Sequence, residues 1–102
     1  MILSSRDYPV GVTMSLILVK HKIIDGKELI EVRDVEIDGQ PHPEITDMYA
    51  TNRLGRFLHK YGLNGYTMSG HKVTFIKLPE TLYGDDGRIH KVEFFIPTDL
   101  DK

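Results

Sequence analysis

The chain has 102 residues, no cysteine and a formal net charge of −2 at pH 7. This length predicts one domain, residues 1–102, and the lack of cysteine excludes disulfides, thiolate metal sites and cysteine nucleophiles. The slight acidity argues against nucleic-acid binding driven by bulk charge, and a cytoplasmic, reducing setting fits best. Polar residues and Pro9 interrupt the apolar amino-terminal stretch, so we expect neither a signal peptide nor a membrane span.

Two apolar runs on either side of Asp25-Gly26 predict an amino-terminal β-hairpin over residues 10–37. Asp-Gly is a strong hairpin signal because both residues of a type I′ turn need positive φ. This turn predicts a register in which the opposed pairs are Ile24 and Lys27, Lys20 and Glu31, Val19 and Val32, Leu18 and Arg33, and Met14 and Ile37.

The predicted register places apolar side chains on both faces of this hairpin. A half-exposed sheet alternates apolar with polar residues, so a second apolar face implies a cover. Either the remaining strands and the amino-terminal arm wrap this face, or it meets another chain, as in a homodimer. The residues of this possible oligomer face are Ile17, Val19, Ile30 and Val32.

Residues 43–62 are the one long segment with helical periodicity. Pro43 suits a first helical turn and Gly62 suits the position after the last turn. The expected core-facing stripe consists of Ala50, Leu54, Phe57, Leu58 and Tyr61.

Residues 71–96 predict a second hairpin, whose connection ends in Gly84-Asp85-Asp86-Gly87, and residues 97–102 read as a polar tail. The element order is ββαββ. We therefore expect an α+β fold with an antiparallel sheet of about four strands and one amphipathic helix packed on one face. Two hairpins in separate sheets are the alternative, because the pattern does not determine the strand order in space.

No motif in the chain indicates a reaction. The five histidines lack the spacing of a metal site, no serine stands in a G-x-S-x-G turn, and no glycine-rich loop precedes a helix as phosphate binding requires. We therefore predict no catalytic, metal-binding or cofactor-binding residues. A small enzyme of unrecognised type stays the least favoured alternative.

The outer face of the predicted helix combines apolar, aromatic and basic side chains, which are enriched where proteins bind one another. Its candidate partner-binding residues are Ile45, Met48, Tyr49, Arg53, Arg56 and Lys60. In the alternative interpretation, the first helical turn bends toward the core and buries Ile45 and Met48.

We therefore expect a small non-catalytic protein-binding module, such as an adaptor, inhibitor or subunit, that self-associates and acts through the outer helix face or the second sheet face. A small cysteine-free domain also suits a phage or mobile-element inhibitor of host proteins. The alternative is a nucleic-acid binder, in which basic helix residues contact phosphate and aromatic side chains stack on bases. The residues for that role are Tyr49, Arg53, Arg56, Lys60, Tyr66, Phe75 and Phe95.

Overall fold

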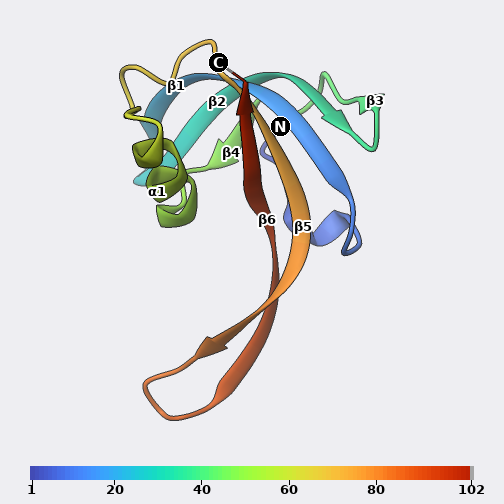
Figure 1. The fold of residues 1–102 in the computed structure, drawn as a ribbon, viewed down its shortest axis with the longest axis vertical. Coiled ribbons are helices and arrows are strands. Elements are labelled where there is room, and N and C mark those ends of the chain that lie inside the picture. Colours follow the sequence, from blue (N-terminus) through green and yellow to red (C-terminus); the bar gives the residue numbers. More distant parts are fainter. Residues whose placement is uncertain (102) are drawn as a thin grey trace.

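The computed structural model describes residues 1–101. In this part of the chain, six strands form one sheet in the order β3-β2-β1-β5-β6, and β4 also pairs with β2 (Figure 1). The elements are the 3₁₀ helix η1 (Ser5–Asp7), β1 (Thr13–Ile24), β2 (Lys27–Ile37), β3 (Gln40–Pro41), β4 (Asp47–Tyr49), α1 (Asn52–Lys60), β5 (Lys72–Tyr83) and β6 (Ile89–Asp101).

The expected ββαββ fold with a four-stranded sheet is wrong. Two short strands, β3 and β4, stand between the first hairpin and the helix, and both pair with β2. The helix has nine residues instead of the twenty expected over 43–62, and it covers one end of a curved sheet (Figure 1). The fold is α+β with a dominant antiparallel sheet.

The helix begins late because Thr51 caps it and because the residues before Thr51 are used by the core. Thr51 has an extended backbone, and its side-chain oxygen accepts a hydrogen bond of 3.2 Å from the Leu54 N–H. Ile45 is only 2% exposed, and Met48 is buried on β4 opposite Ile30. Burying these two side chains outweighs the weak helical propensity of a stretch that holds Pro43.

The first hairpin has the predicted turn and the predicted pairs at its two ends, where Ile24 faces Lys27 and Met14 faces Ile37. Asp25 and Gly26 both have positive φ, at 51° and 77°. The predicted pair of Lys20 and Glu31 is also present, and the register is shifted by one residue only around Ile17 and Leu18, because each strand carries one bulge.

The two bulges cancel each other along the hairpin. β2 has an extra residue beside Asp34, whose φ is 52°, and β1 has an extra residue at Val19. In the segment between them, Leu18 faces Val32 instead of the expected Arg33. A slip of one residue turns side chains to the other face, so Val32 joins the core.

The core lies inside the curve of the sheet and is closed by α1 and the amino-terminal segment. Leu54 and Leu58 of the predicted helix stripe are buried there, whereas Tyr61 is exposed and Phe57 and Ala50 are partly buried at the margin. The buried cluster consists of Leu3, Val12, Met14, Leu16, Leu18, Ile30, Val32, Val35, Ile37, Ile45, Met48, Leu54, Leu58, Met68, Val73, Phe75 and Leu100.

The second hairpin is longer than predicted and extends out of the sheet. β6 continues through residues 97–101, which were expected to form a tail. β1 pairs with β5 only over residues 72–76, whereas β5 and β6 stay paired out to Tyr83 and Ile89. Residues 78–94, here called the arm, therefore project from the body as a twisted two-stranded ribbon (Figure 1).

Candidate functional site

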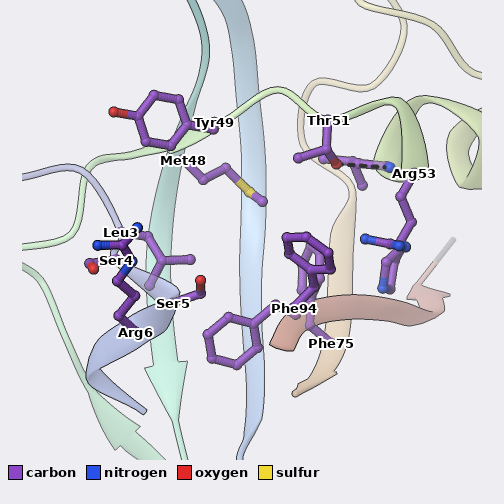
Figure 2. A pocket seen from close by; sticks show the side chains of 13 residues that line it. Leu3, Ser4, Ser5, Arg6, Met48, Tyr49, Thr51, Arg53, Phe75 and Phe94 are labelled. Atoms are coloured by element: carbon purple, nitrogen blue, oxygen red, sulfur yellow. Dashed lines mark hydrogen bonds between the residues drawn. The ribbon is translucent and has the colours of Figure 1, made fainter. Parts of the chain in front are cut away.

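A cavity of about 440 Å³ lies between β6, the start of α1, β4 and the amino-terminal segment. Figure 2 shows Met48 and Tyr49 on one side, Arg53 on the other, and Phe75 and Phe94 between them. This volume is in the range of small-molecule and side-chain pockets. The cavity is lined by Leu3, Ser4, Ser5, Arg6, Met48, Tyr49, Thr51, Arg53, Leu54, Phe75, Phe94, Phe95 and Pro97.

The cavity follows the outer edge of β6. Phe94 and Phe95 both line it, and successive residues of a strand point to opposite faces of the sheet. A hollow lined by both residues therefore reaches the edge of the strand. Within residues 1–101, β5 is the strand paired with β6, so the other side of β6, here called the β6 edge, has no strand beside it.

Pro97 determines which backbone groups point outward at the β6 edge. Pro97 has no N–H to donate to β5, and proline in an edge strand sits with its nitrogen facing away from the partner strand. Residues two apart in a strand share this direction. The backbone groups of Phe95, Glu93 and Lys91 therefore point outward, whereas those of Val92 and Phe94 point toward β5.

Arg53 connects α1 to the arm. Its guanidinium group lies 4.8 Å from the centre of the Phe94 ring, a cation–π contact, and it forms an ion pair with Glu80. The ring and the carboxylate both belong to the arm, on the face that holds Val92 opposite Glu80. Arg53 thereby fixes one wall of the cavity at the base of the arm.

Lys77 anchors the amino-terminal wall of the cavity. Its side chain is 2% exposed, and its ammonium group donates hydrogen bonds to the carbonyl oxygens of Ser5 and Tyr8. The carboxylate of Glu93 lies 3.8 Å from the same ammonium group. A buried charge needs such partners, and here they hold η1 against β5 and β6.

An ion pair holds β4, the strand that carries Tyr49, in place. Lys22 Nζ lies 2.6 Å from Asp47 Oδ1 and 3.5 Å from Glu31 Oε1. The ammonium group of Lys22, assisted by a hydrogen bond from Thr46, holds the pKa of Asp47 below its ordinary value. The same contact with Asp47 raises the pKa of Lys22.

The structure divides the six predicted partner-binding residues. Met48, Tyr49 and Arg53 line the cavity, with Tyr49 47% exposed and Met48 buried. Ile45 is buried in the core, as the alternative interpretation of this segment had it, although it lies in the connection between β3 and β4 instead of in a helix. Arg56 and Lys60 are exposed on α1, away from the residues that line the cavity.

The structure separates the four residues of the predicted oligomer face. Ile30 and Val32 are core residues, since the bulges turn this part of β2 inward. Ile17 and Val19 are half-buried on β1. Among the aromatic residues considered for stacking on bases, Phe75 is buried, Phe95 is packed against the core, and Tyr66 is exposed away from the cavity.

The sequence interpretation missed Leu3, Phe94 and Pro97 as cavity residues. One signal was present: Phe94, Phe95 and Ile96 are three successive apolar residues, and such a run indicates a strand that is covered on both faces.

Among residues 1–101, no three histidine, aspartate or glutamate side chains converge as a metal site would require. The helix in this part of the chain is too short to cross a lipid bilayer. No family model, curated protein or solved structure matches the chain. The function must therefore be argued from the cavity and the β6 edge.

Proposed function

We propose that the chain is a non-catalytic protein-binding module that takes up an extended polypeptide segment along the β6 edge. The observation that carries this proposal is the position of the cavity, which borders the unpaired edge of β6 at Phe94, Phe95 and Pro97. Strand addition to such an edge gives affinity through main-chain hydrogen bonds, and adjoining pockets give specificity through alternate side chains.

The bound segment would pair with the outward backbone groups of Lys91, Glu93 and Phe95. Alternate side chains of that segment would then enter the cavity, whose aromatic wall includes Tyr49 and Phe94. Tyrosine and arginine are frequent binding hot spots, and here Tyr49 is half-exposed with Arg53 across the cavity.

This proposal keeps the functional class expected from the sequence and changes the surface. Tyr49 and Arg53 keep their partner-binding role, whereas Arg56 and Lys60 have no part in it. The cytoplasmic location inferred from the lack of cysteine stays a prediction.

A library of random displayed peptides tests the proposal. We expect it to yield extended, apolar peptides whose binding protects the amides of Lys91, Glu93 and Phe95 from hydrogen exchange. Tyr49→Ala should weaken the selected peptides about tenfold, as loss of a moderate hot spot does. Tyr66→Ala is the matched control, because Tyr66 is 95% exposed and lies outside the cavity. Selected peptides that protect other amides, or equal effects of the two variants, would refute the proposal.

A further inference from the structure

The tip of the arm carries apolar side chains that the other residues of 1–101 leave exposed. Tyr83 is 78% exposed and Ile89 is 60% exposed, and these two residues face each other across the last pair of β5 and β6. Exposed apolar side chains gathered at the end of a projecting ribbon are candidates for contact with another molecule. Tyr83 and Ile89 would be buried by contact with an apolar surface, and the cavity at the base of the arm offers such a surface.

The sequence of β6 is complementary to itself. Two copies of one strand can pair antiparallel about a two-fold axis, so that the same edge meets itself. Main-chain bonding requires that residues with outward groups face each other, which here are Ile89, Lys91, Glu93 and Phe95. The possible registers then differ only in the residue that lies on the axis.

Charge and the position of Pro97 favour one register over those centred on Lys91, Glu93 or Phe94. An axis at Lys91 or at Glu93 sets like charges directly opposite each other, which is unfavourable. An axis at Phe94 sets Lys91 against Pro97, which has no N–H to donate. With Val92 on the axis, Lys91 of each copy faces Glu93 of the other, giving two opposite-charge pairs.

The same register joins the arm tip to the cavity. With Val92 on the axis, Ile89 of one copy lies directly opposite Phe95 of the second copy, and Phe95 lines the cavity. The tip of each arm therefore lies beside the base of the other arm.

From this agreement of backbone direction, charge and apolar contact we infer that the segment bound at the β6 edge is β6 of a second copy. The chain forms a two-fold dimer in which the arms pair antiparallel about Val92. This inference rests on the proposed function, because it names the occupant of the same edge.

A cysteine cross-link on the axis tests the register directly, since the chain has no cysteine of its own. Facing residues of a pair without main-chain hydrogen bonds have Cα atoms about 4.5 Å apart, within the range that a disulfide spans. Val92→Cys should therefore yield a covalent dimer under mild oxidation. Thr81→Cys, at an exposed position on the other strand of the arm, should stay monomeric on a non-reducing gel. Equal cross-linking of both variants, or none of Val92→Cys, would overturn the inference.

Charge reversal supplies a second, independent test. Lys91→Glu places two glutamates opposite each other at both symmetric positions, so the dissociation constant of the dimer should rise about tenfold or more in light scattering and sedimentation. Lys91→Gln, which removes the charge without reversing it, should weaken the dimer less than Lys91→Glu does. A wild-type chain that is monomeric at high concentration, or a Lys91→Glu chain that dimerises as before, contradicts the inference.

The two proposals fail in different ways. If the wild-type chain is monomeric but displayed peptides still protect the amides of Lys91, Glu93 and Phe95, the self-pairing is wrong and strand capture stands. If neither peptides nor a second copy protect these amides, the proposed function is wrong as well.

Discussion

Alanine substitutions at Ile45 and Tyr49 distinguish the observed fold from one in which residues 43–51 form a helix. In a helix these residues stand four apart, on the same face, so truncating either side chain would have a similar effect. In the structure Ile45 is 2% exposed and Tyr49 is 47% exposed. The substitutions Ile45→Ala and Tyr49→Ala should therefore differ sharply in their effect on stability.

The expected magnitudes follow from burial. Truncating a buried isoleucine to alanine costs roughly 2–5 kcal/mol, a large share of the 5–15 kcal/mol that holds a typical domain. A loss of about 3 kcal/mol lowers the Tm of a domain of this size by roughly 12–24 °C. Tyr49→Ala removes a half-exposed side chain from the cavity rim and should cost about 1 kcal/mol or less.

Thermal and urea unfolding, followed by circular dichroism, measure both variants against the wild-type chain. The comparison requires an unchanged urea m-value, which shows that the same surface unfolds in each variant. If both substitutions lowered the free energy of unfolding by the same small amount, Ile45 would lie on an exposed helix face, and the assignment of β4 to the sheet would be wrong.

Three further substitutions have definite expected outcomes. Because the pKa of Asp47 is lowered, its pair with Lys22 stabilises the fold above the ordinary carboxyl pKa of about 3.9, and this contribution is lost as pH falls through the lowered value. Asp47→Asn should thus be less stable than wild type at neutral pH and should lose less stability on acidification. Urea midpoints measured across this pH range test the prediction, and parallel profiles of the two proteins would contradict it. Thr51→Ala removes the cap of α1 and should cost about 1 kcal/mol, with Asn52→Ala as the exposed control in thermal melts. Lys77→Met removes the charged donor to the carbonyls of Ser5 and Tyr8 and should lower the free energy of unfolding by about 1.5–3 kcal/mol. Proteolysis of the amino-terminal segment should then be faster, and an unchanged cleavage rate would exclude the anchoring role of Lys77.

The sequence predicted the parts of the fold that depend on local signals. Asp25-Gly26 fixed the first turn, and the pairs at both ends of that hairpin follow from it. The two bulges were not predictable, because they cancel outside the short segment from Ile17 to Val19 and leave both end pairs unchanged. Nothing local marks them except Asp34, a residue type that tolerates positive φ.

The long helix was predicted because Ile45, Met48 and the stripe after Ala50 continue one apolar pattern. Local periodicity cannot distinguish a helix turn from a short strand that adds to a sheet edge distant in sequence. β4 forms because the edge of β2 offers backbone partners for Met48 and a buried place for its side chain. That is a tertiary effect, which overrides the weak preferences of the segment.

The cavity was beyond sequence reasoning for the same reason. Its walls come from four separate parts of the chain, and only their arrangement in space brings Leu3, Tyr49 and Phe94 together. Tyr49 and Arg53 were predicted as partner-binding residues from their chemical type, and the structure places both at the cavity without testing that role.

The arm separates, within one hairpin, the residues that maintain the fold from those that meet the surroundings. Phe75 and Lys77 are buried at its base, whereas Leu82, Tyr83 and Ile89 at its tip are largely exposed. Substitutions at the tip therefore change surface chemistry at little cost in folding free energy. Over evolutionary time, or in the laboratory, partner preference could diversify through these few positions while the sheet and helix stay the same.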